Sequence, residues 1–355
     1  MSQYWSDTVH QLSPYVPGEQ PRMANLIKLN TNEHPLAPAD SVLEAIAAVT
    51  TDSLRRYPDP DAILLRQAIA SAEGLTSAQV FVGNGSDEVL GHAFQALLKK
   101  SQPLSLPDVT YSFYPVWAQL YGIERLTIPL AYDYSIDIAA LCASAGPVII
   151  ANPNAPTGIA ISLDNIITLL RSDPARIVVI DEAYFGFGAE TAATLINAFG
   201  NLLVTRTLSK SHALAGLRVG YALGHSALIE GLSRVKDSFN SYPVDAIAQV
   251  AARAAIADKA WFDEASAVVV HNRAALTNGL QALGFVVLPS RANFVFTEHN
   301  HLSGSQLFTA LRQRHILVRR WDQPRIENFL RITVGTAEQI DQLLVTLKEL
   351  IELSN

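Results

Sequence analysis

The chain has 355 residues, and its 26 basic and 33 acidic side chains give a formal net charge of −7. This length favours two domains, and a composition with 49% hydrophobic and 17% charged residues argues against disorder. The negative charge argues against a nucleic-acid partner or an anionic membrane surface, and no apolar run reaches the length of a bilayer span. Cys142 is the single cysteine, so no intramolecular disulfide or cysteine-based metal site is expected, which favours a reducing cytoplasm.

The chain begins with a proline-rich segment. Three prolines and a glycine within residues 14–21 disfavour a helix, so we expect an extended arm over residues 1–30. Short helices are predicted at 39–49 and 63–72, on either side of a turn-rich segment at 55–60.

From residue 80 onward, short apolar runs alternate with helical patterns. This alternation predicts an α/β fold, with a mainly parallel central sheet flanked by helices on both faces. In such sheets, ligands bind outside the carboxyl ends of the strands. The predicted strands are 80–82, 104–106, 148–151, 177–180, 202–205 and 219–223, and the predicted helices are 89–98, 115–121 and 163–170.

The alternation becomes less strict near residues 242–243. We therefore predict a large domain over 31–242 and a smaller α+β domain over 243–355 that packs with the arm. The smaller domain is expected to contain helices at 244–283, 306–315 and 337–353 and strands at 285–288, 293–296, 317–318 and 330–334.

Lys210 is the most informative side chain, because it follows the apolar run 202–205 and has hydroxyl neighbours. A desolvated lysine can form an imine with an aldehyde, and burial and the cation Arg218 would both disfavour its charged form. Ser209 supplies a hydroxyl, and Arg218 a planar fork suited to phosphate oxygens. A lysine picked at random is more often a surface side chain, so the neighbours carry this interpretation.

Two further polar clusters follow apolar runs. Asp181 comes directly after 177–180, and a buried carboxylate there needs a partner such as a protonated pyridine nitrogen. The alternative is a structural aspartate that caps the next segment. Tyr184 could donate to a phenolic oxygen, and Asn154 of the rigid loop 152–158 could direct its amide to the same atom, although an Asn-Pro loop is more often a plain turn.

A glycine-rich segment precedes the helix at 89–98. Glycines permit close backbone approach and helix N-terminal amides favour a phosphate, with Ser86 and Asp87 as the donors. A capped helix without a ligand explains this segment almost as well. Tyr111 is a candidate to stack on a pyridine ring, or else a core aromatic.

Arg319 and Arg331 lie near predicted strand ends, where either could bind a carboxylate or phosphate. Taken together, the clusters supply an amine for an aldehyde, an anion for a pyridine nitrogen, donors for a phenolic oxygen and a cradle for a phosphate. That combination predicts a site for pyridoxal 5'-phosphate (PLP).

With these residues, the chain resembles the fold-type I PLP enzymes, and among them the histidinol-phosphate aminotransferases, over nearly its whole length. The Lys210 segment is typical of the superfamily. The matching segments are Leu-Asn-Thr-Asn-Glu at 29–33, Arg-Tyr-Pro-Asp at 56–59, Gly-Ser-Asp-Glu at 85–88, Asn-Pro-Asn-Ala-Pro-Thr-Gly at 152–158, Asp-Glu-Ala-Tyr at 181–184, Arg-Thr-Leu-Ser-Lys at 206–210, Ala-Gly-Leu-Arg at 215–218 and Leu-Arg-Ile-Thr-Val-Gly at 330–335.

For the cofactor ring, the resemblance implies that Lys210 carries PLP as a Schiff base and that Asp181 pairs with the pyridine nitrogen. It further implies that Asn154 and Tyr184 hold the phenolic oxygen and that Tyr111 stacks on the ring. Ala155 stands where the family often has a second asparagine, which is expected to matter little if Asn154 is the contacting residue.

The resemblance also implies a homodimer with shared active sites, because Tyr57 would reach the phosphate of the neighbouring subunit's cofactor. Arg319 and Arg331 would bind the acidic ends of substrates, and Tyr15 of the arm is expected to close over the amino donor. The residues implied around the cofactor phosphate are Ser86, Asp87, Ser209 and Arg218.

The implied reaction is a ping-pong transamination between two small molecules, an amino donor and a 2-oxo acid. The expected pair is L-histidinol phosphate and 2-oxoglutarate, which give imidazole-acetol phosphate and L-glutamate in histidine biosynthesis. The alternatives are an aromatic amino-acid aminotransferase and a PLP-dependent decarboxylase acting on threonine phosphate. A non-catalytic regulator would carry an added basic DNA-binding domain, for which a 30-residue arm is too short.

Overall fold

A seven-stranded sheet forms the centre of the computed structural model, which describes residues 2–21 and 23–353. The strand order is β2-β8-β7-β6-β5-β3-β4, with parallel pairing from β7 through β4 and with β8 antiparallel to both of its neighbours. The predicted α/β fold with a mainly parallel sheet is confirmed. The strands are β2 (Val80–Asn84), β3 (Leu104–Pro107), β4 (Arg125–Ile128), β5 (Val148–Ala151), β6 (Val178–Asp181), β7 (Leu202–Thr207) and β8 (Val219–Gly224).

Helices cover both faces of this sheet because successive strand side chains point to opposite sides. Val178 and Ile180 pack into one apolar core, whereas Val179 between them packs into another. The first core contains side chains of α2 (Asp40–Ala47), α4 (Ile63–Glu73), α8 (Leu163–Ser172) and α11 (Ala246–Ala257), and the second contains those of α5 (Gly85–Ala93), α6 (Tyr114–Tyr121) and α10 (Ser226–Asp237).

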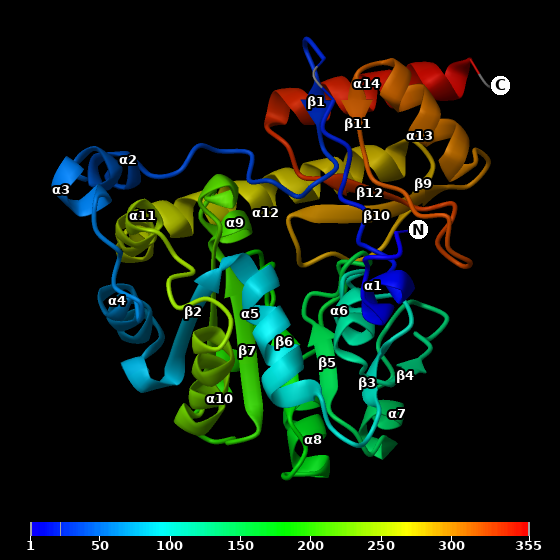
Figure 1. Ribbon diagram of the computed structural model, residues 1–355. Coiled ribbons are helices and arrows are strands. Elements are labelled where there is room, and N and C mark those ends of the chain that lie inside the picture. The colour runs from blue at the N-terminus through cyan, green and yellow to red at the C-terminus, as the bar shows by residue number, and fades with distance from the viewer. Residues whose placement is uncertain (1, 22, 354–355) are drawn as a thin grey trace.

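A smaller antiparallel sheet, of order β12-β10-β9, lies above the large one in Figure 1, and α12 runs from beside α11 to this sheet. The arm is tied to the same unit, because β1 (Ile27–Lys28) pairs in parallel with β11 (Ile316–Leu317). The remaining elements of this unit are α12 (Lys259–Ala282), β9 (Phe285–Val287), β10 (Phe294–His299), α13 (Gly304–Gln313), β12 (Leu330–Thr333) and α14 (Ala337–Glu352).

Two element predictions are wrong, each for a local reason. The arm is not extended throughout, because Ser6 accepts a hydrogen bond from the N–H of Val9 and caps α1 (Asp7–Gln11). The helix expected over 244–283 is two helices, because the chain turns at Asp258, whose side chain accepts from the N–H of Trp261 to begin α12.

The domain boundaries at 30/31 and 242/243 remain predictions. The 242/243 division assigns α11 to the smaller domain, although this helix packs against α2 and α4. In the described part of the chain, no helix has both the length and the apolar character that crossing a bilayer requires.

Candidate active site

A cavity of about 430 Å³ lies at the edge of the large sheet where β5, β6 and β7 end. Residues of the arm, and of the C-terminal unit including β12, also line it. Every predicted site residue lines this cavity except Asn154 and Tyr57. The residues brought together are Tyr15, Ser86, Asp87, Tyr111, Asp181, Tyr184, Ser209, Lys210, Arg218, Arg319 and Arg331.

Lys210 lies in α9 (Leu208–Ser211), the short helix that follows β7, and its Nζ donates to the carbonyl oxygen of Thr31 at 2.6 Å. Burial, followed by the guanidinium of Arg331, lowers the pKa of Lys210 to about 8, against the opposing attraction of Glu33. Arg331, and not Arg218 as expected, is the leading cation in this effect. At neutral pH the amine is therefore far closer to its nucleophilic form than an exposed lysine.

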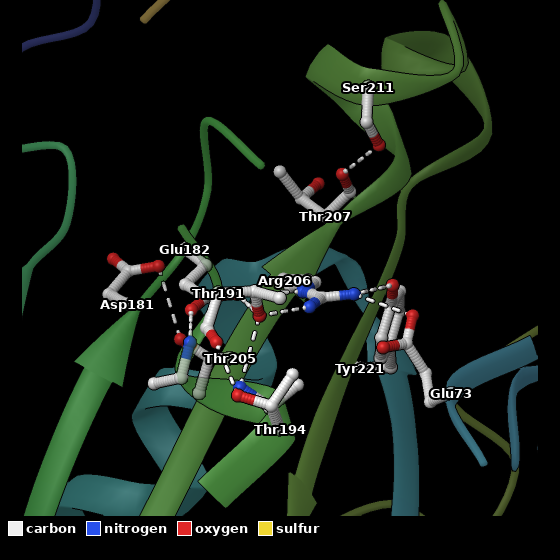
Figure 2. Close-up of polar contacts among 12 residues, drawn as sticks. Glu73, Asp181, Glu182, Thr191, Thr194, Thr205, Arg206, Thr207, Ser211 and Tyr221 are labelled. Atoms are coloured by element: carbon white, nitrogen blue, oxygen red, sulfur yellow. Dashed lines mark hydrogen bonds and ion pairs between the residues drawn. The ribbon is translucent and has the colours of Figure 1, made fainter. Parts of the chain in front are cut away.

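Asp181 is the last residue of β6 and is almost fully buried. Its Oδ2 accepts a hydrogen bond from the hydroxyl of Tyr114 at 2.7 Å, and its Oδ1 accepts one from Thr205 on β7 at 3.1 Å, as Figure 2 shows for Thr205. Burial raises the pKa of Asp181 to about 6, although both hydrogen bonds oppose this rise. Within residues 2–21 and 23–353 this carboxylate has no ion-pair partner, so a cation supplied by a ligand would remove the cost of burying it.

Behind Asp181 lies a buried ion network centred on Arg206 of β7 (Figure 2). The guanidinium donates from Nε to Glu182 at 2.9 Å and from Nη1 to Glu73 of α4 at 2.6 Å. It also donates to the hydroxyls of Thr191 and Tyr221. The network therefore joins β7, β8, α4 and the segment that follows β6.

The predicted phosphate cradle is assembled at the start of α5. Arg218 donates to Asp87 at 3.0 Å and to the hydroxyl of Ser209 at 3.5 Å. Gly85 has a φ of +76°, and a Cβ there would lie 2.6 Å from the guanidinium, so a side chain at this position would displace Arg218. With Ser86 at the first helical turn, this end of the cavity combines helix amides, a hydroxyl and a guanidinium.

Aromatic side chains form one wall of the cavity. The hydroxyl of Tyr111 donates to Asp87 at 3.2 Å, and its ring meets that of Tyr114 edge-on with centroids 5.4 Å apart. Tyr15 of the arm stacks on Phe113 with centroids 4.8 Å apart. The arm is thus already in contact with this wall.

Arg319 and Arg331 lie side by side, since their backbones pair in an antiparallel bridge. Arg331 donates to the carbonyl of Asn30, and its buried Nε has no partner within the described residues. Arg319 donates to the carbonyl of Val16. Both guanidiniums therefore lie over the arm, without a carboxylate partner in the described ranges.

Asn154 is not among the residues that line the cavity. Its amide donates to the carbonyl of Val109 at 2.9 Å and to the hydroxyl of Thr157 at 3.1 Å, and its oxygen accepts from Thr110. The amide is thus engaged inside the protein, and Ala155 lines the cavity in its place.

Tyr57 also lies outside the cavity. It is 82% exposed and stacks on Tyr242 with ring centroids 4.6 Å apart. It belongs to an exposed surface that another subunit could cover.

Among the cavity-lining residues that the sequence interpretation missed are Thr31, Asn32 and Trp321. Asn32 donates to the hydroxyl of Tyr184 at 3.0 Å, and Trp321 lies 5.2 Å from the guanidinium of Arg331. The first two lie within the 29–33 segment that carried the resemblance. No comparable signal marked Trp321, which follows two arginines in an irregular loop.

The residues present fit PLP. The cavity offers a partly neutral amine at Lys210, an unpaired buried carboxylate at Asp181, the hydroxyl of Tyr184 and a basic cradle at Arg218. These are the groups required by an aldehyde, a pyridine nitrogen, a phenolic oxygen and a phosphate.

Comparison with known proteins agrees with this geometry. The histidinol-phosphate aminotransferase of Gluconacetobacter diazotrophicus is 56% identical over 339 residues, which cover 96% of this chain and 95% of that protein. Histidinol-phosphate aminotransferase 1 of Bradyrhizobium diazoefficiens is 56% identical over 351 residues, covering 99% of this chain and 100% of that protein. The structure of histidinol-phosphate aminotransferase from Sinorhizobium meliloti in complex with pyridoxal-5'-phosphate matches with a TM-score of 0.89 at 25% identity, covering 100% of this chain and 99% of that one.

Residues 24–347 match the family model described as aminotransferase class I and II. This match spans all three sheets and every predicted site residue except Tyr15. The chain belongs to the class I and II aminotransferases.

Proposed function

We propose that this protein is a PLP-dependent aminotransferase that converts L-histidinol phosphate and 2-oxoglutarate into imidazole-acetol phosphate and L-glutamate, in histidine biosynthesis. The observation that carries the proposal is the meeting of Lys210, Asp181 and Tyr184 in one cavity of a class I and II aminotransferase. The names of relatives at 56% identity support the substrate. A cytoplasmic location is also proposed, and the single cysteine of the chain supports it.

Bound PLP supplies an electron sink that makes the hydrogen on the amine-bearing carbon of the substrate acidic. In this proposal, Lys210 would hold PLP through its Nζ, and the same nitrogen would serve as the base that accepts and returns the substrate proton. Its lowered pKa suits both tasks. Asp181 would keep the pyridine nitrogen of PLP protonated, and Tyr184 would donate to its phenolic oxygen.

One end of the cavity is proposed to bind the cofactor and the other to bind the substrates. Ser86, Asp87, Ser209 and Arg218 are proposed to bind the cofactor phosphate, with Tyr111 against the ring. Arg319 and Arg331 are proposed to bind the phosphate of the donor and the carboxylates of the 2-oxo acid in turn, and Tyr15 to cover them. The unpaired Nε of Arg331 supports this role.

A second copy of the chain is proposed to complete the site. Tyr57, Phe239 and Tyr242 are all exposed, and Tyr57 stacks on Tyr242. Two subunits joined here would bury these aromatic rings. Tyr57 is then proposed to reach the phosphate of the partner's cofactor.

The test is a panel of amino donors offered to the purified holoenzyme, with L-glutamate and carbon dioxide both measured. We expect L-glutamate to form from 2-oxoglutarate fastest with L-histidinol phosphate. Faster turnover with phenylalanine would identify an aromatic aminotransferase instead. Carbon dioxide from threonine phosphate, without any need for a 2-oxo acid, would identify a decarboxylase.

A further inference from the structure

Asn32 joins the arm to Tyr184 through a side chain that is fully buried. Its Nδ2 donates to the hydroxyl oxygen of Tyr184 at 3.0 Å. Its backbone φ of +54° lies in the left-handed region, which asparagine tolerates better than most residues. Asn293 of the C-terminal unit donates to the carbonyl of Asn32 at 2.9 Å and holds this turn in place.

Thr333 of β12 fixes which way the amide of Asn32 points. The hydroxyl of Thr333 accepts from the backbone N–H of Asn32 at 3.0 Å and donates to Oδ1 of the same residue at 3.1 Å. A buried hydroxyl hydrogen needs an acceptor, and Oδ1 provides it. The Nδ2 group must then face Tyr184.

The direction of the hydrogen bonds that run from Thr333 through Asn32 decides whether Tyr184 donates or accepts in the cavity. Because its oxygen accepts from Asn32, its own hydrogen is left for another acceptor, and it has none within residues 2–21 and 23–353. Tyr184 lines the cavity, so this hydrogen is available to a ligand there. The charged and titratable groups that act on Tyr184 include Arg331, Asp181, Tyr15, Tyr111 and Tyr114.

We propose that Asn32, held by Thr333, is a positioning residue that makes Tyr184 a hydrogen-bond donor to the phenolic oxygen of the cofactor. This rests on the proposed function, since it presumes PLP in the cavity. Ala155 supports the proposal, because an alanine lining the cavity has no side-chain amide to donate to the phenolic oxygen. Tyr184 then carries a larger share of the contact than it would beside an asparagine.

The test uses cofactor binding and absorbance, with activity as a secondary measurement. A hydrogen-bond donor to the phenolic oxygen lowers the pKa of the proton that this oxygen would share with the Lys210 nitrogen. Asn32→Asp keeps the shape and the left-handed backbone but replaces the donor with an acceptor. We expect it to raise the pH midpoint of the bound cofactor's absorbance change by about one unit and to weaken PLP binding about tenfold.

Two substitutions of Thr333 test the same series of hydrogen bonds without adding a charge. Thr333→Val should raise the midpoint in the same direction, whereas Thr333→Ser, which keeps the hydroxyl, should behave as the native protein does. In a Tyr184→Phe background, Thr333→Val should produce no further shift, which a merely structural role would not predict.

The outcomes separate two failures. If the native protein binds PLP and its absorbance titrates but the Asn32 and Thr333 variants match it, this inference is overturned and the proposed function stands. Equal shifts of Thr333→Val with and without the Tyr184 hydroxyl also overturn it. A native protein that binds no PLP contradicts the proposed function itself.

Discussion

Lys210 is the residue on which burial and electrostatics act together. Removal from water and the nearby guanidinium of Arg331 both disfavour its charge, while Glu33 and Asp87 favour it. The net result is a pKa of about 8, compared with 10.5 for an unperturbed lysine. The fold thereby prepares an amine for reaction close to neutral pH.

This shift predicts how the cofactor-free protein captures PLP. The reactive form is the neutral amine, and a lowered pKa means that this form dominates above about pH 8. The capture rate should rise with pH, with its midpoint near that value, as followed by absorbance in a stopped-flow series. A midpoint close to 10.5, the value of an exposed lysine, would contradict the account.

The residues after the strand ends could be predicted because parallel strands finish at one edge of a sheet, which brings Asp181 and Lys210 together. The orientation of Asn154 could not, since it depends on hydrogen bonds to Val109 and Thr157 that no local pattern announces. Trp321 likewise reaches the cavity only through the path of its loop.

At the level of elements, the strands beneath the cavity are held by polar contacts as well as by packing. Arg206 is 1% exposed and bonds to two carboxylates, Glu182 and Glu73. Glu182 directly follows Asp181, whose carboxylate is proposed to face the pyridine nitrogen. Removing one partner of such a network leaves charges buried without compensation.

Arg206→Ala is therefore expected to lower the free energy of unfolding by about 3–5 kcal/mol, measured by urea denaturation of the cofactor-free protein. Arg234→Ala, which breaks an exposed pair with Glu230 on α10, is the control and should have a far smaller effect. Equal effects in the two variants would show that the buried network does not stabilise the site.

Buried strands were predictable because their apolar runs are continuous, as in β6. Strand β4 was missed because it lies at the sheet edge with Arg125, Leu126 and Thr127 exposed, which dilutes the apolar pattern. Helices α7 (Ile138–Ala143) and α10 were also missed. The first is very short, and the second has a near-even mix of polar and apolar residues.

At the scale of the whole molecule, the exposed aromatic residues on one face remain to be explained. Phe239 is 79% exposed and Tyr57 is 82% exposed, which is unfavourable for rings of this size in a lone subunit. The proposed dimer would cover both and place Tyr57 at a partner's active site. The division into arm, large domain and small domain stays a prediction at this scale.

Phe239→Asp should weaken the dimer, because a charge would be buried in the proposed interface. Sedimentation equilibrium should show dissociation at concentrations where the native protein remains dimeric, and PLP binding should weaken with it. Tyr132→Asp replaces another fully exposed aromatic residue and should change neither property. A native protein that sediments as a monomer would contradict the shared site.

The central claim, that PLP is attached to Lys210, can be tested by reducing the PLP-treated protein with borohydride and mapping the labelled peptide by mass spectrometry. The account predicts a pyridoxyl label on the peptide that contains Lys210 and its loss in Lys210→Ala. A label on another lysine, such as the neighbouring Lys28, or no label on the native protein, would contradict it.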